Sequence, residues 1–139
     1  MLISKKWLND HLDVTDLSNS DFDNVLTFAG VEVEGITEKG VSSDRVIVAQ
    51  VVESEQHPNA DRLSVTKVDT GEAELRQIVC GAKNYKVGDK VPCALPGASL
   101  PGGFEIKETI MRKVESKGML CSAVEVGLGS DHSGLMILP

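Results

Sequence analysis

The most constraining feature of this sequence is a two-residue alternation of apolar and polar side chains that begins at Arg45. Such alternation is typical of half-buried strands. It predicts strands at residues 46–53, 63–69, 76–80, 90–95, 104–107 and 109–112. Gly and Pro separate these runs, and Pro92 places its strand at an edge or a bulge. About five short strands with little helix between them favour a small barrel or sandwich.

The first forty residues carry a different pattern. Residues 4–12 start with a serine suited to an N-cap and predict a short helix. Ser20, followed three residues later by Asp23, resembles a capping box and predicts a second helix that ends before Gly30. Alternation at residues 31–36 then predicts a strand.

The composition of residues 39–44 predicts a linker or turn between these two parts. We therefore expect two domains, a small α/β unit at residues 1–40 and a β domain at residues 41–139. The full length of 139 residues suits one domain with an appendage. Forty residues bury little apolar surface by themselves, so the helices of the first unit are expected to need a further covering surface.

The charge balance bears on the class of partner. The chain has 14 basic and 21 acidic residues and a net charge of −7, which argues against strong non-specific binding to nucleic acid. The charge is unevenly distributed, however, because residues 83–117 contain seven basic against four acidic side chains. A basic face on an acidic protein is therefore compatible with the composition.

The cysteines indicate the redox compartment. Cys80, Cys93 and Cys121 lie in apolar surroundings, and none belongs to a C-x-x-C pair. This pattern favours reduced core thiols, as in cytoplasmic proteins. No stretch approaches the roughly 18 apolar residues of a membrane span, and no signal-like segment follows Met1. We expect a cytoplasmic protein that does not contact a membrane.

Two short signatures lie within the β region. The first, His57-Pro58-Asn59-Ala60-Asp61, predicts a rigid loop between two strands, since Pro58 restricts His57 and the Asn and Asp side chains can bond to nearby backbone. The second is Ser116-Lys117-Gly118-Met119. Here the Ser116 hydroxyl can either cap a turn or meet a phosphate, and Met119 has the character of a core residue. A plain loop and a plain strand-to-helix turn are the alternative interpretations.

A basic tetrapeptide, Lys83-Asn84-Tyr85-Lys86, follows Gly81. A tyrosine between lysines can stack a base while the lysines meet phosphates, although a solvated turn with a half-buried aromatic explains it equally well. Catalytic patterns are weak: the sequence has no Walker loop and no dinucleotide fingerprint, and Asp131-His132-Ser133 cannot form a triad by itself. We expect no enzyme active site and no metal site in this chain.

In combination these residues resemble a known family. The motifs His57-Pro58, residues 60–63, residues 77–82 and residues 116–120 are similar to the tRNA-binding oligonucleotide-binding (OB) barrel of several aminoacyl-tRNA synthetases. Residues 1–8, 28–34 and 100–107 extend the resemblance to the amino-terminal part of bacterial phenylalanyl-tRNA synthetase β subunits. The resemblance implies a mainly β fold, a five-stranded barrel of the OB type with an α/β amino-terminal appendage.

The resemblance also implies a function and partners. It implies auxiliary tRNA docking within an α2β2 heterotetramer, with the α subunit and the rest of the β subunit as protein partners. ATP, Mg²⁺ and phenylalanine would be bound elsewhere in that enzyme, which leaves no cofactor in this chain. Residues 1–40 would be the first half of a split domain. The implied nucleic-acid contacts lie near Lys83, Asn84, Arg112, Ser116, Lys117 and Met119, and Lys113 joins them because it adds positive charge to the same segment.

Two other functions stay open at this stage. In the first alternative, the domain is an assembly module without RNA contact, and the net charge of −7 favours this function. In the second, the chain is a free-standing tRNA-binding or chaperone-like dimer, against which the first 40 residues argue.

Overall fold

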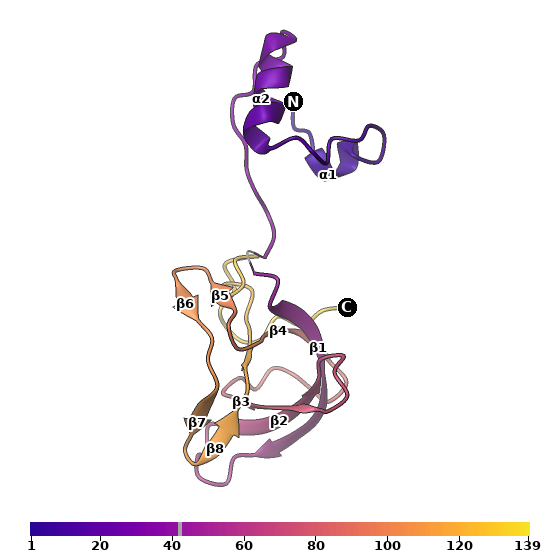
Figure 1. The fold of residues 1–139 in the computed structure, drawn as a ribbon. Coiled ribbons are helices and arrows are strands. Elements are labelled where there is room, and N and C mark those ends of the chain that lie inside the picture. Colours follow the sequence, from indigo (N-terminus) through magenta and orange to yellow (C-terminus); the bar gives the residue numbers. More distant parts are fainter. Residues whose placement is uncertain (42) are drawn as a thin grey trace. The chain divides into compact units, whose positions relative to one another are not determined.

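The computed structural model describes residues 1–41 and 43–139. The chain divides into two compact units, Met1–Glu38 and Lys39–Pro139, which we describe separately. Figure 1 shows the helices in the first unit and the strands in the second. Ser42, in the predicted linker, lies outside the described residues. That the first unit is one half of a split domain stays a prediction.

The first unit contains two helices, α1 (Lys5–Leu8) and α2 (Asn19–Phe28). Ser4 caps α1 as predicted, but the helix ends four residues earlier than residue 12. The cap of α2 is Ser18 instead of Ser20: its hydroxyl accepts from the Asp21 backbone N–H at 3.1 Å and donates to the Asp21 carboxylate at 2.6 Å. The N-cap therefore lies two residues earlier than predicted, and the Asp21 carboxylate accepts from the Ser18 hydroxyl and not, as in a capping box, from the N-cap backbone N–H.

The predicted strand at residues 31–36 is wrong, because this segment has no regular secondary structure. An alternating segment becomes a strand only where a neighbouring edge accepts its backbone hydrogen bonds. The unit buries little: Val14 is its one buried apolar side chain among the described residues, whereas Trp7 is 65% and Phe28 90% exposed. What covers this apolar surface stays a prediction.

The second unit is a five-stranded antiparallel sheet in the order β3-β2-β1-β4-β9, with two short hairpins, and it confirms the predicted mainly β, OB-like barrel. Its strands are β1 (Val46–Gln56), β2 (Ser64–Asp69), β3 (Arg76–Cys80), β4 (Lys90–Ala94), β5 (Ser99–Leu100), β6 (Phe104–Glu105), β7 (Thr109–Met111), β8 (Val114–Ser116) and β9 (Met119–Leu120).

Strand β1 organises the barrel. Its first half pairs with β4 and its second half with β2, and the register shifts between Val51 and Glu53. A bulge of this kind bends a strand and increases its twist, which lets one strand belong to two faces of a barrel. Burial alternates along β2, where Ser64, Thr66 and Val68 are buried and Lys67 and Asp69 are exposed, so two of its three buried residues are polar.

Two apolar clusters form the core of this unit. The first lies between the main strands and includes Val51, Val68, Ile78 and Val91. The second packs Leu100 and Ile106 with residues of the chain after β9. The β5–β6 and β7–β8 hairpins lie at opposite ends of the unit in Figure 1. The end that carries β7–β8 also carries the loop between β1 and β2, and the candidate site is there.

Candidate nucleic-acid interface

Ser116 closes the barrel. It is only 2% exposed, and its hydroxyl accepts from the Val79 N–H of β3 at 3.0 Å and donates to the Gly118 carbonyl at 3.1 Å. Beside it, the Lys117 N–H donates to the Gln77 carbonyl at 2.9 Å. The chain thus runs from the free edge of β3 to β9, which pairs with β4. Of the two interpretations of Ser116, the turn cap fits this geometry better than the phosphate contact, because its hydroxyl is buried and already bonded on both sides.

Gly118 is required at this crossing. Its φ is +144°, and a Cβ at this position would lie 2.8 Å from the Ala94 carbonyl oxygen of β4. Met119 is half-buried and packs against the second apolar cluster, which agrees with its core character. The Ser116-x-Gly118-Met119 signature is therefore explained mainly by closure of the barrel.

The basic tetrapeptide after β3 also has a structural role. The Asn84 amide donates to the Leu135 carbonyl and accepts from the Leu135 N–H, both at 2.9 Å, and so it mimics a short backbone ladder. Tyr85 packs against the first core cluster, and its hydroxyl lies 3.0 Å from the Ser54 hydroxyl. Asn84 and Tyr85 therefore hold the loop after β3, and the half-buried aromatic interpretation of Tyr85 fits the geometry.

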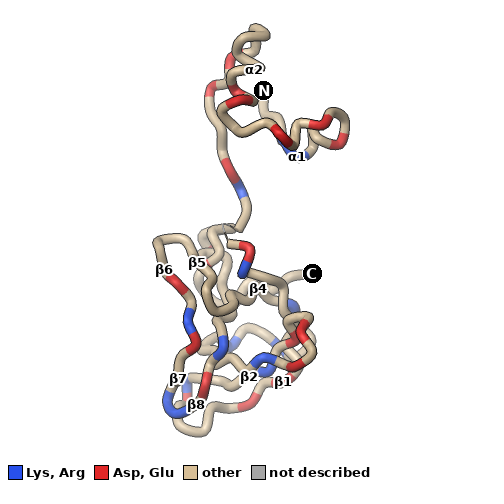
Figure 2. Tube along the Cα trace, in the orientation of Figure 1, with Lys and Arg blue, Asp and Glu red and all other residues tan. Residues whose placement is uncertain are grey.

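The remaining predicted residues are cations, and they differ in their partners. Lys117 lies 3.5 Å from the Glu115 carboxylate, which neutralises part of its charge. Arg112 and Lys113 are exposed at the tip of the β7–β8 hairpin, where Figure 2 shows positive charge. Lys83 is exposed, and its ammonium donates to the Ser64 hydroxyl at 2.9 Å. Across residues 1–41 and 43–139, none of Lys83, Arg112 and Lys113 has a carboxylate within ion-pair distance.

Arg62 is a cation that sequence reasoning missed as a contact. It is exposed in the β1–β2 loop and, within the described part of the chain, has no ion-pair partner. Asn59, Ala60, Asp61, Arg62 and Leu63 line a depression of about 470 Å³ together with Arg112. The motif at residues 57–63 could have indicated a contact at Arg62, because it places a basic residue in a loop that Pro58 stiffens.

We call Arg62, Lys83, Arg112 and Lys113 the cationic rim. These four residues come from three connections that meet at one end of the barrel. Lys83 donates to Ser64, the first residue of β2, which directly follows the β1–β2 loop, and the Arg112 carbonyl accepts from the Asn59 amide of that loop at 3.0 Å. Exposed cations without carboxylate partners are available for phosphate oxygens.

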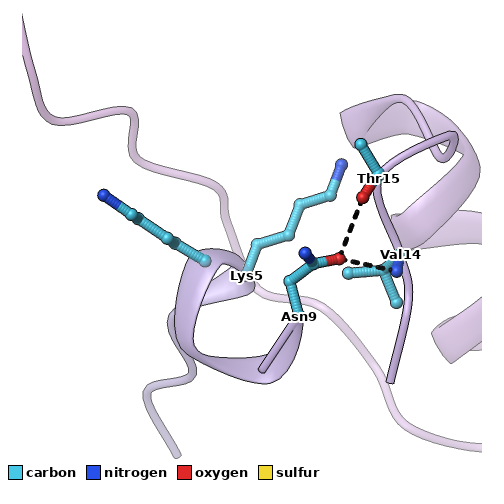
Figure 3. A pocket seen from close by; sticks show the side chains of 5 residues that line it. Lys5, Asn9, Val14 and Thr15 are labelled. Carbon is cyan, nitrogen blue, oxygen red and sulfur yellow. Dashed lines mark hydrogen bonds between the residues drawn. The ribbon is translucent and has the colours of Figure 1, made fainter. Parts of the chain in front are cut away.

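The first unit has a depression of its own, shown in Figure 3. Its volume is about 290 Å³, and Lys5, Asn9, Val14 and Thr15 line it. The Asn9 side-chain oxygen accepts from the Val14 N–H at 2.9 Å and from the Thr15 hydroxyl at 3.2 Å. Because these polar groups already satisfy one another, the depression is explained as the closure of the turn after α1.

The cysteines are buried and unpaired with one another. Burial raises the pKa of the Cys93 and Cys121 thiols to about 12, and it also raises the pKa of Cys80. A thiol with a raised pKa is a poor nucleophile near neutral pH. This agrees with the interpretation of the three cysteines as core residues.

Comparison with known proteins decides the family. A family model described as "Putative tRNA binding domain" matches residues 46–139, which is most of the chain and nearly all of the barrel unit. This chain belongs to the tRNA-binding domain family. The resemblance predicted from the motifs is thereby confirmed, and the matched residues include all four positions of the cationic rim.

The relatives extend the match to the first unit. The chain is 48% identical to the phenylalanine–tRNA ligase β subunit of Bdellovibrio bacteriovorus, 52% to that of Chromobacterium violaceum and 53% to that of Neisseria gonorrhoeae. Each alignment covers 100% of this chain but 17% to 18% of the relative. The chain therefore spans less than a fifth of the length of these relatives, and it matches their N-terminal region.

Solved structures also match part of the chain. One of them is the C-terminal domain of Plasmodium vivax p43, with 31% identity and a TM-score of 0.44 over 55% of this chain and 45% of that one. Separately, no helix in the described part of this chain is long and apolar enough to span a membrane.

Proposed function

We propose that this chain is the tRNA-docking module of a phenylalanine–tRNA ligase β subunit. The observation that carries the proposal is the cationic rim, whose four exposed cations meet at one end of a barrel of the tRNA-binding domain family. Phosphate contacts orient a nucleic acid and carry little sequence information. The rim would therefore position tRNA while other parts of the enzyme select it.

The proposal includes partners, cofactors and location. The protein partners would be the α subunit and the remaining β subunit of an α2β2 heterotetramer in the cytoplasm. ATP and Mg²⁺ would be bound outside this chain. Lys83, Arg112 and Lys113 carry the proposed contact, Arg62 is added to them, and Lys117 contributes less because Glu115 lies beside it. Asn84 and Met119 contribute by holding the loops in place.

Binding of the 139-residue chain to unfractionated tRNA across a salt series tests the proposal. Four phosphate contacts at 0.7 to 0.9 per contact predict a log–log slope of about −3, or about 60-fold weaker binding at 200 mM than at 50 mM salt. The double variant Lys83→Glu and Lys113→Glu should reduce the steepness of this slope by about 1.5. The double variant should weaken the binding of all tRNAs by the same factor.

A charge-matched control separates local contacts from net charge. Lys67→Glu with Lys90→Glu changes the total charge equally but lies on β2 and β4 and not in the rim loops. If both double variants lost the same amount of tRNA affinity, the effect would come from the net charge and not from local contacts. If the binding of phenylalanine tRNA alone became weaker, this result would contradict positioning by phosphate contacts. No binding at low salt would favour the assembly module, for which the exposed Trp7 and Phe28 offer a surface.

A further inference from the structure

The turn between β7 and β8 has an unusual sequence for its conformation. Met111 pairs with Val114, so the connection has two residues, Arg112 and Lys113. Both have positive φ, +51° and +71°, as in a type I′ turn. Such turns favour Asn and Gly, because other side chains meet steric resistance in this region. A turn built from Arg and Lys therefore needs support from its surroundings.

The β1–β2 loop supplies this support. The His57 ring donates from Nε2 to the Met111 carbonyl at 3.0 Å, and the Asn59 amide donates to the Arg112 carbonyl at 3.0 Å. Two consecutive carbonyls at the start of the turn thus accept from the same loop. The Asn59 backbone N–H donates to His57 Nδ1 at 3.0 Å, which leaves the ring proton on Nε2. His57 is 2% exposed, so its position is well determined by packing.

The loop is itself held by one side chain. The Gln56 amide nitrogen lies 2.9 to 3.1 Å from the carbonyls of Ala60, Asp61 and Leu63. The His57 backbone N–H also donates to the Leu63 carbonyl at 3.1 Å. A loop with this many internal bonds can impose a conformation on a neighbour, and the strained neighbour here is the cationic turn.

The supported turn faces a polar depression. Arg112 lines it with residues 59–63, which include Arg62 and also Asp61. The residues that line the depression therefore include two arginines and one aspartate. A phosphodiester with a single negative charge fits such a site when both guanidinium groups are held in place.

We propose that His57 and Asn59 are positioning residues for RNA binding, which hold the Arg112–Lys113 turn so that its cations and Arg62 meet one stretch of RNA backbone. This inference rests on the proposed tRNA-docking function. His57 and Asn59 act through the turn and need no contact with RNA. The residues of the β1–β2 loop thereby become part of the binding machinery of the barrel.

A double-mutant cycle in the full chain tests the inference. Asn59→Ala removes one bond from an exposed side chain and leaves the backbone N–H to His57 intact. It should weaken tRNA binding about two- to fivefold, because one hydrogen bond to the turn is lost. Lys113→Gly removes the steric resistance at one turn position. In that background the same Asn59→Ala change should leave affinity unchanged within about 1.5-fold.

Hydrogen exchange provides a readout that does not depend on RNA. Asn59→Ala should accelerate exchange at Met111 and Val114, which flank the turn, by up to about fivefold, and should not do so in the Lys113→Gly background. Circular dichroism of each variant verifies that the barrel is folded. These two readouts separate a support role from a direct contact of Asn59 with RNA.

The outcomes are distinct. Equal weakening by Asn59→Ala in both backgrounds would overturn the inference, since the residue would then act without the turn. Wild-type affinity and unchanged exchange in Asn59→Ala would also overturn it while the docking function stands. A wild-type chain that binds no tRNA at low salt would remove the docking function and the RNA side of this inference together. Exchange at Met111 and Val114 would then still decide whether the loop holds the turn.

Discussion

Replacement of Ser116 by Ala separates barrel closure from phosphate contact. The wild-type hydroxyl makes two hydrogen bonds, at 3.0 Å from Val79 N and 3.1 Å to Gly118 O. The substitution leaves the Val79 N–H buried without an acceptor, which costs about 1 to 3 kcal/mol, and loss of the second bond adds about 0.5 to 1 kcal/mol. We expect the free energy of unfolding to fall by about 2 to 3 kcal/mol.

The measurement is urea and thermal unfolding followed by circular dichroism. For a unit of this size, the expected loss corresponds to a melting temperature about 10 to 20 °C lower. Ser133→Ala is the matched control, because Ser133 is exposed and its hydroxyl donates to the Asp131 carboxylate at 2.7 Å. That variant should stay within about 0.5 kcal/mol of the wild type.

Binding of tRNA completes the test. Measured well below the melting temperature, Ser116→Ala should bind tRNA with wild-type affinity within about twofold, because its hydroxyl does not reach the surface. The opposite pair of results, unchanged unfolding with binding weakened tenfold or more, would refute the assignment of this serine to closure. It would restore the hydroxyl as a phosphate contact.

Three further predictions concern the same unit. Gly118→Ala should lower the free energy of unfolding by at least about 2 kcal/mol more than Gly88→Ala. Both glycines have positive φ, but only at Gly118 would a Cβ lie against a carbonyl, at 2.8 Å. Equal losses of stability in urea unfolding would mean that the chain around Gly118 relaxes freely. Because burial raises the pKa of Cys93 and Cys121 to about 12, the folded chain keeps these protons while the unfolded chain loses them near pH 9, so the contribution of these two thiols to stability should be constant below about pH 9 and decline above it. A Cys93→Ala variant should show a shallower decline, and an identical one would contradict the assignment. Asn84→Ala should lower the free energy of unfolding by about 1 to 2 kcal/mol and accelerate exchange of the Leu135 amide, because both bonds between them disappear; unchanged exchange at Leu135 would rule out the tether.

The sequence was most informative where alternation extends over several residues. β2, β3 and β4 were predicted within one residue at each end, although only β3 and β4 present continuous apolar residues to the core, whereas β2 buries Ser64 and Thr66 beside Val68. The short strands β5, β8 and β9 were missed, because two or three residues cannot display a period. Residues 31–36 have the pattern of a strand but no pairing edge, which is a tertiary condition that local sequence cannot report.

The sequence predicted which residues lie at the candidate site better than it predicted what each of them does. The cluster of cations near the second signature was visible in the sequence, and Arg112 and Lys113 are indeed exposed. The role of Ser116 was not accessible, because its partner Val79 lies 37 residues away in the chain. The pairing of Lys117 with Glu115 and the support of the turn by His57 likewise depend on contacts that only folding creates.

The crossing at Ser116 has a consequence for self-association. Elsewhere the strands of the barrel are joined by backbone ladders, but here side chains contribute much of the connection. The Ser116 hydroxyl bonds to Val79, and the Gln77 amide donates to the Glu115 carbonyl at 2.8 Å. Local opening there would expose β3 as an unprotected edge whose sequence includes Ile78, Val79 and Cys80. An apolar edge of this kind templates pairing with another chain. Opening of this crossing by heat or mutation would thus be a route from a folded barrel to an aggregating one.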